Sequence, residues 1–167
     1  MNKEIAFDTL IQHHKGIIYK ITNAYCKNEE DRKDLIQEII IQLWKSFDNY
    51  NAQYKQSTWI YRISLNVSIS FYRKEKRRNE LTQTHPLSII THVDTADKIQ
   101  EQEETIRQLH QFIAELKELD KALMLLYLEE KSHKEMAEIM GISESNVATK
   151  IGRIKQVLKL KFSLINN

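Results

Sequence analysis

The chain has 167 residues, of which 41% are hydrophobic, enough for one ordinary domain or two small ones with a buried core. Only 3 glycines and 1 proline are present, which favours a mostly helical protein, because strand-rich folds need more turn residues. The net charge of +2 implies no partner by itself, and the single cysteine excludes an intrachain disulfide. The cysteine count fits a reducing compartment, and no segment has the apolar length of a signal peptide core or a membrane span. We therefore expect a cytoplasmic protein with no membrane segment of its own.

Three helices are predicted in the amino-terminal half. Residues 4–25 place apolar side chains every three or four positions, which is the period of an amphipathic helix. Asn28 is positioned to cap a second helix over residues 29–47, whose first turn is acidic. The apolar stripe of this second helix consists of Leu35, Ile36, Ile39, Ile40, Leu43, Trp44 and Phe47. Residues 48–57 break the pattern and are predicted to form a loop, after which a third helix runs to residue 78.

The composition changes after residue 78. Residues 79–97 are polar, contain the only proline and show no sustained period, so they are predicted to be a flexible linker. Helical spacing resumes over residues 98–167. The expected fold is therefore all-α, with two small helical bundles, residues 1–78 and 98–167, joined by that linker.

Charge follows the same division. The net charge is +5 over residues 62–78, −5 over residues 94–120 and +4 over residues 144–161, so each bundle ends in a basic helix. A single charge run usually marks a solvated helix face. Aromatic residues accompany the first basic run, however, and aromatic side chains stack on unpaired bases while Lys and Arg contact phosphates. The two basic helices therefore favour a nucleic-acid partner.

The second bundle contains the pattern of a helix-turn-helix. Ser132 and Glu135 form a potential capping box at the start of one helix, and Gly141 stands where that helix would end in the left-handed conformation. Ser143 can cap a second helix, whose Val147 would face back toward the first. The candidate DNA-contacting residues on this second helix are Ser143, Ser145, Asn146, Thr149, Lys150 and Arg153. The alternative is a plain helical hairpin that closes the bundle.

Three segments resemble the bacterial sigma factors of the small, two-domain, extracytoplasmic-function type. "DRKDLIQEIIIQLWKSF" is similar to region 2.2 of that family, and "STWIYRISLNVSISFYRKEKRR" to its regions 2.3 and 2.4. "KSHKEMAEIMGISESNVATKIGRIKQVLK" is similar to the helix-turn-helix of region 4. The resemblance covers about residues 5–78 and 100–162, and two motif blocks in this order are more specific than either one.

The chain departs from the family pattern in three places. Leu116-Lys117 stands where the family often has Leu-Pro, and Glu130-Lys131 stands where it often has Glu-Gly. These two departures are expected to affect only helix boundaries. The loop over residues 48–57 lacks the Gly-rich or Ser-Phe pattern of many relatives, so the preferred −10 sequence stays open.

The resemblance implies a sigma factor that binds RNA polymerase core and directs promoter-specific initiation, with residues 1–78 as region 2 and 98–167 as region 4. The expected polymerase-binding residues are Asp34, Gln37, Glu38 and Gln42. The residues expected to bind the −10 element are Tyr54, Trp59, Arg62, Asn66, Arg73, Lys74, Lys76 and Arg77. Trp59 could equally belong to the core. Region 4 would read the −35 element through the six residues given above, and an anti-sigma factor is an expected further partner.

Three other interpretations compete with this one. An enzyme is disfavoured, because the six histidines are scattered, no Gly-rich phosphate loop exists and the carboxylate pairs look solvated. We accordingly expect no catalytic residue, no metal, no cofactor and no small-molecule substrate. A helix-turn-helix regulator that acts without polymerase core would need a dimer interface or a receiver domain. A helical scaffold would not need two basic helices.

Overall fold

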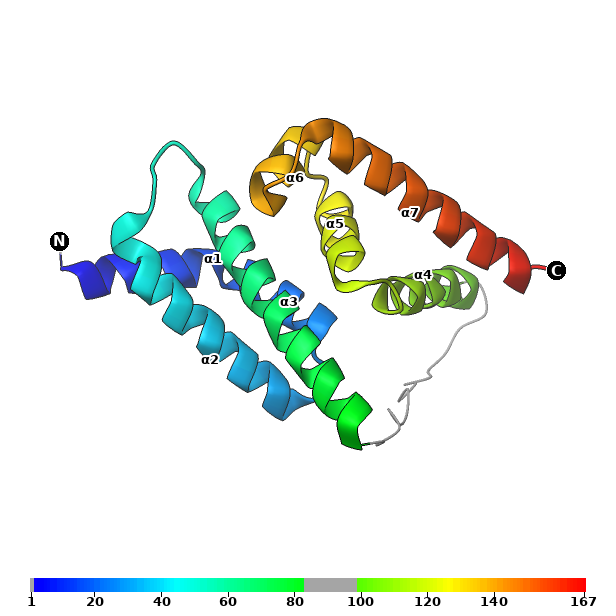
Figure 1. Cartoon of the computed structure of the whole chain (residues 1–167), viewed down its shortest axis with the longest axis horizontal. Coiled ribbons are helices and arrows are strands. Elements are labelled where there is room, and N and C mark those ends of the chain that lie inside the picture. Colours follow the sequence, from blue (N-terminus) through cyan, green and yellow to red (C-terminus); the bar gives the residue numbers. More distant parts are fainter. Residues whose placement is uncertain (1, 83–98) are drawn as a thin grey trace.

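The computed structural model describes residues 2–82 and 99–167, which are helical throughout apart from short connections (Figure 1). The first bundle consists of α1 (Lys3–Tyr25), α2 (Glu29–Ser46), the 3-10 turn η1 (Phe47–Asn49) and α3 (Gln56–Thr82). The second consists of α4 (Ile99–Ala114), α5 (Glu118–Leu128), α6 (His133–Met140) and α7 (Glu144–Ile165). The all-α prediction is confirmed. No helix within the described ranges is long and apolar enough to cross a bilayer.

The first bundle is built around α3, which packs against both α1 and α2. The Asn28 side chain accepts a hydrogen bond of 2.7 Å from the Asp31 amide, so the predicted cap starts α2. Leu35, Ile39 and Leu43 follow at helical spacing and are fully buried. Burying such side chains contributes about 1.5–3 kcal/mol each. This apolar contact fixes which face of each helix remains outside.

Two boundaries and one buried position differ from expectation. α3 continues to Thr82, four residues beyond the predicted end, and η1 extends helical backbone into the expected loop. Residues 83–98, which include most of the predicted linker, lie outside the described residues. Trp44 was expected to face inward, but 36% of it is exposed. It lies at the edge of the core, edge-to-face with Phe7 and with the Lys3 ammonium over its ring.

The second bundle packs α5 against α6 and α7, and its buried residues continue the hydrophobic core of the first bundle. Its innermost side chains are Ala122, Leu123, Leu126, Met136 and Val147. The rings of Phe112 and Phe162, 5.0 Å apart between centroids, attach α4 to α7. This core positions α6 and α7 as a rigid pair.

The end of α5 has an unusual backbone. Glu130 has a φ of 59°, in the left-handed region that favours glycine. The amide of Lys131 donates to the carbonyl of Leu126 at 3.1 Å, the six-to-one bond of a Schellman motif. α5 therefore ends as helices commonly do, but with a residue whose side chain makes this conformation costly.

The two bundles also pack against each other, because α3 contacts both α5 and α6 (Figure 1). Figure 1 shows α6 beside the beginning of α3, and the α5 end nearest α4 beside its middle. Each bundle therefore covers part of the other.

Candidate nucleic-acid interface

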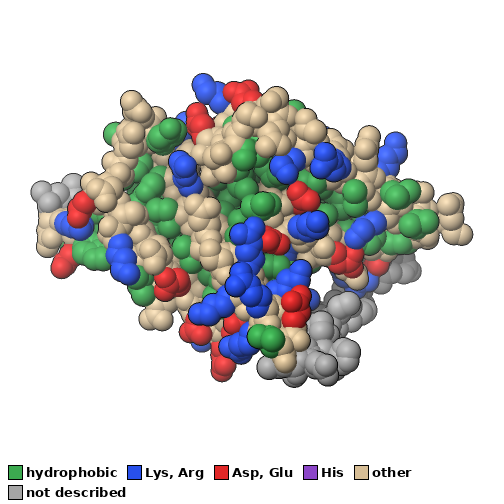
Figure 2. Space-filling view, viewed as in Figure 1, with side chains coloured by type: hydrophobic (Ala, Val, Ile, Leu, Met, Phe, Trp, Pro, Cys, Tyr) green, Lys and Arg blue, Asp and Glu red, His purple; other side chains and the backbone are tan. Residues whose placement is uncertain are grey.

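The outward face of α3 carries three of the predicted strand-binding residues, together with Ser70, on successive turns. Arg62, Asn66, Ser70 and Lys74 are spaced by four and all are exposed, because Ile60, Leu65 and Ile69 occupy the opposite face. Arg77 continues the exposed face into the last turns of α3, and Lys76 is exposed beside it. Lys and Arg side chains gather over the lower part of α3 in Figure 2. This stripe can contact phosphates along a strand.

The polar residues of α2 face the same stripe. Asp34, Glu38 and Gln42 line one side of a groove of about 580 Å³, and Asn66, Ser70 and Lys74 line the other. The Gln42 amide donates to the Glu38 carboxylate at 2.8 Å, which orients both side chains. Gln37 lies elsewhere, in a hollow beside Tyr19 on the other side of α2. The structure thus brings three of the four polymerase-binding candidates together with Asn66 and Lys74.

The loop between η1 and α3 is held by aromatic packing. The Tyr50 ring lies 5.3 Å from the Trp59 ring, and the Tyr50 hydroxyl donates a hydrogen bond to the carbonyl of Tyr54. The side-chain oxygen of Asn51 accepts from the Gln53 amide at 3.0 Å, which tightens the turn. These contacts leave 40% of Tyr54 exposed at the loop, available to a base.

Trp59 is half-buried rather than exposed on the outward face of α3. Its ring contacts Phe47 as well as Tyr50, with centroids 6.3 and 5.3 Å apart. Of the two roles left open for Trp59, this packing supports the structural one, because Phe47 and Tyr50, which begin the loop, both pack against its ring.

Arg73 differs from its neighbours on α3 because it is already paired. Its Nε lies 2.6 Å from the carboxylate of Glu118 at the start of α5. The hydrogen bond from Arg73 is the main cause that lowers the pKa of Glu118, and a hydrogen bond from the backbone amide of Glu118 itself adds to it. Arg73 therefore belongs at once to the basic stripe and to the contact between the bundles.

The helix-turn-helix has the local geometry that the sequence predicts. Ser132 and Glu135 form a capping box, with bonds of 3.1 and 3.0 Å, and α6 ends at Gly141 with φ 69° in the left-handed region. The Ser143 hydroxyl accepts from the Asn146 amide at 3.1 Å, which starts α7. Val147 and Ile151 are buried against the rest of the bundle. One face of α7 is therefore fixed outward.

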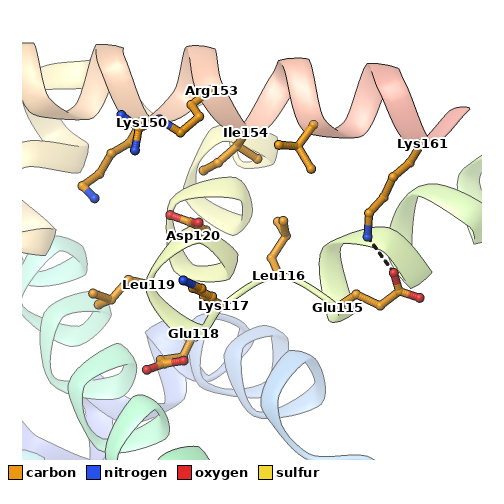
Figure 3. A pocket seen from close by; sticks show the side chains of 11 residues that line it. Glu115, Leu116, Lys117, Glu118, Leu119, Asp120, Lys150, Arg153, Ile154 and Lys161 are labelled. Carbon is orange, nitrogen blue, oxygen red and sulfur yellow. Dashed lines mark hydrogen bonds and ion pairs between the residues drawn. The ribbon is translucent and has the colours of Figure 1, made fainter. Parts of the chain in front are cut away.

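Most of the predicted DNA-reading residues lie on that outward face, and two of them also line a hollow between α5 and α7. Ser145, Asn146, Thr149 and Arg153 are exposed, whereas Lys150, which was expected to point outward, is half-buried. Lys150 and Arg153 line a hollow of about 500 Å³ opposite Asp120 and Leu119 of α5 (Figure 3). The Ser143 hydroxyl caps α7 by accepting from the Asn146 amide, so its first role is to start this helix.

Comparison with known proteins identifies the two bundles. Residues 10–78 match the family model of sigma-70 region 2, and residues 106–158 match that of sigma-70 region 4. The chain is an extracytoplasmic-function sigma factor. The alternative, a helix-turn-helix regulator that acts without polymerase core, is not favoured, since the chain matches region 2 as well as region 4.

Relatives of this sigma factor match along most of their length. SigW of Bacillus subtilis, named an ECF RNA polymerase sigma factor, is 28% identical over 92% of this chain and 87% of its own. SigV of the same organism, an RNA polymerase sigma factor, is 25% identical over 93% and 90%. The function of the sigma factor is RNA polymerase-associated, promoter-directed transcription initiation.

Two solved structures share the fold. CnrH, in complex with the cytosolic domain of CnrY, has a TM-score of 0.68 and 17% identity over 98% of this chain and 91% of its own. RpoE of Bartonella quintana, in complex with the anti-sigma factor NepR, has a TM-score of 0.69 and 14% identity over 95% and 97%. The arrangement of seven helices in the described residues is thus the fold of these sigma factors.

Sequence reasoning missed two residues that the structure places beside the candidate interface residues. Ser70 lines the α2–α3 groove four residues after Asn66, and the helical spacing of exposed positions could have predicted it. Lys55 follows Tyr54 directly and is exposed, but its ion pair with Glu135 depends on the second bundle. No local sequence signal could have indicated that partner.

Proposed function

We propose that region 2 binds RNA polymerase core through Asp34, Glu38 and Gln42 of α2, with Gln37 at the margin of the contact. The observation that carries this proposal is the α2–α3 groove, because one surface there joins exposed acidic and amide groups to a basic stripe. An acidic helix face beside a nucleic-acid stripe lets one domain hold a protein partner and a strand at once.

We infer that the −10 element binds as an unpaired strand along α3 and the preceding loop. Tyr54 offers an exposed ring for stacking, and Asn66 offers an amide for base edges. Lys74, Lys76 and Arg77 lie further along α3 for phosphate contacts, with Arg62 and Arg73 completing the basic set. Trp59 supports the loop from below.

We infer that the −35 element is read as duplex by the start of α7. Asn146 and Arg153 are exposed and have the groups that make bidentate contacts to adenine and guanine. Thr149 lies between them and the exposed Ser145 directly precedes them, and Lys150 stands at the edge of this surface for a phosphate.

We infer a cytoplasmic location, where polymerase core and promoter DNA are found, and an anti-sigma factor as a further partner. CnrH shares this fold and was solved with CnrY, and RpoE was solved with NepR, an anti-sigma factor. The support for an anti-sigma partner is the shared fold of these two proteins.

The deciding experiment combines a core-binding assay with transcription in vitro. Asp34→Lys with Glu38→Lys should reduce retention of the chain on purified core at least tenfold, since each reversal places a cation where an anion is recognised. Asp8→Lys with Glu103→Lys makes the same charge change at exposed positions outside the groove and serves as the control. Equal retention of both variants would overturn the assignment of α2 as the polymerase surface.

A further inference from the structure

A cavity of about 620 Å³ lies where the end of α1, the second half of α3 and the junction of α4 with α5 meet. It is distinct from the α2–α3 groove, with which it shares only Phe71 among the lining residues. Its walls include three aromatic rings, two small side chains and a lysine: Tyr25, Phe71, Tyr72, Cys26, Ala114 and Lys121. This volume suits a small organic molecule, because ligand pockets commonly enclose about 300–1,000 Å³.

Lys121 places a buried charge in the wall of this cavity. Only 3% of the residue is exposed, and its ammonium lies 5.1 Å from the centroid of the Tyr25 ring and 4.8 Å from that of the Tyr72 ring. Among residues 2–82 and 99–167, no carboxylate forms an ion pair with this ammonium. A buried ammonium is costly without an anion beside it, and ring faces offset only part of the lost hydration.

The surroundings of Lys121 also oppose its charge. Burial lowers the pKa of Lys121 and the nearby Lys27 lowers it further, against a smaller opposite influence of Glu118 and Cys26. The Cys26 thiol does not supply the missing anion, since burial raises its pKa to about 11. An anion bound beside the ammonium would therefore stabilise the charged form of Lys121.

The charged groups around the cavity limit that anion to a single negative charge. Besides Lys121, the lining contains three carboxylates and two lysines, which are Asp31, Glu75, Glu80, Lys27 and Lys76. Three carboxylates against three cations give the lining a formal net charge of zero. A nucleotide or another polyanion would bring several negative charges close to the three carboxylates, which is unfavourable. One carboxylate facing Lys121 avoids this repulsion.

The aromatic walls favour a ligand with a ring. The rings of Tyr25 and Tyr72 lie edge-to-face with centroids 6.1 Å apart, and Phe71 precedes Tyr72 on α3. The Tyr25 hydroxyl donates a hydrogen bond of 2.7 Å to the carbonyl of Glu118, which fixes the position of its ring. Aromatic molecules pack well against such walls in offset or edge-to-face geometry.

We propose that this cavity binds a small aromatic monocarboxylate, whose carboxylate pairs with Lys121 and whose ring packs against Phe71 and Tyr72. The alternative is that Lys121 only holds α5 against Tyr25 and Tyr72. The two roles differ in what removal of the ammonium changes. A ligand-binding lysine can be replaced by an apolar side chain of similar length with little loss of stability, but with loss of the ligand.

The experiment is a calorimetric titration of the full chain with β-naphthoate, with β-naphthylmethanol as an uncharged probe of similar shape. We expect the carboxylate to bind the parent about tenfold more tightly than the alcohol, because only the carboxylate forms a charge-assisted pair with the ammonium. Equal affinity for the two probes, or no binding of β-naphthoate at millimolar concentration, would overturn the site.

Lys121→Met removes the cation and keeps a side chain of similar length. We expect its affinity for β-naphthoate to fall about tenfold, to that of the alcohol, while circular dichroism shows unchanged helicity. Lys117→Met is the matched control, since Lys117 is exposed, lies outside the cavity and precedes Lys121 by one turn. The control should bind β-naphthoate like the parent. Parent-like binding by Lys121→Met would overturn the role assigned to Lys121.

Two further measurements decide the question even if Lys121→Met does not fold. Ala114→Phe fills the cavity from an exposed position and should weaken β-naphthoate binding about tenfold without unfolding the chain. Cys26 is the only cysteine and lines the cavity, so β-naphthoate at ten times its Kd should slow alkylation of Cys26 by iodoacetamide about tenfold. Parent-like binding by Ala114→Phe, or alkylation that the probe does not slow, would overturn the site by placing the probe elsewhere.

Discussion

The two bundles present nucleic-acid-facing residues by different physical means. In the second bundle, α7 begins where a capping box, a left-handed glycine and a serine cap place it, all within twelve residues. In the first bundle, the residues on α3 depend on contacts between separate elements: Phe47 and Tyr50 pack on Trp59, and Phe47 packs in turn on Phe7 of α1. The comparison teaches that hydrogen bonds between residues close in the sequence set the start of α7. Packing between separate elements instead sets the loop before α3.

The strongest test of that difference is Trp59→Ala. We expect a loss of about 3 kcal/mol in the free energy of unfolding, because the large ring supports Phe47 and Tyr50. Urea unfolding followed by circular dichroism measures it, and Trp59→Phe should recover much of the loss. Parent-like unfolding combined with weak strand binding would instead make Trp59 a base-stacking residue.

Gly141→Val tests the left-handed helix end that sets the turn between α6 and α7. A β-branched residue at φ 69° costs about 2 kcal/mol, although the space beside Gly141 is open enough for a Cβ. Gly152→Ala is the matched control, since Gly152 is an exposed α7 position with nothing near its Cβ and should gain up to about 1 kcal/mol. Thermal unfolding of both variants measures the contrast. Equal stability would show that the left-handed turn carries no constraint.

Substitutions on α7 sharpen the comparison at the level of recognition. Asn146→Ala and Arg153→Ala should each cost about 1.5 kcal/mol at one −35 base pair and relax the preference there. Lys150→Ala should weaken all −35 sequences alike and reduce the salt slope by about one. Holoenzyme binding to a panel of −35 mutants at several salt concentrations distinguishes them. Parent-like behaviour of all three variants would leave α7 as a helix that only closes the bundle.

The smallest expected effect is at the other left-handed helix end. Glu130→Gly should stabilise the chain by about 0.5 kcal/mol, because relief of backbone strain exceeds the added entropy of the unfolded chain by a small margin. Glu130→Ala removes the same charge without relieving the backbone and should give no gain. A gain of equal size in both variants would assign the effect to charge.

Much of the fold could be predicted from the sequence, but less of the candidate interface. The helix starts at Asn28, Ser132 and Ser143 were predicted correctly, because a capping side chain bonds an amide two or three residues away. The end of α3 was placed four residues early, because a polar composition there does not stop a helix. Trp44 was assigned to the core by its period, yet it lies at an edge that only the packing of α1 defines.

The sequence by itself determined the helices and the helix-turn-helix, because periodicity and capping act over one or two turns. The family came from the resemblance of three segments to known sigma factor regions. Only the tertiary structure decided that Trp59 lies beneath the loop, that Lys150 is half-buried and that Arg73 faces Glu118. These features join residues as far as 45 positions apart, and their side-chain chemistry is compatible with many partners. Which partner each one meets depends on how the apolar core shared by the two bundles brings distant helices into contact, and this information is not contained in any short stretch of the chain.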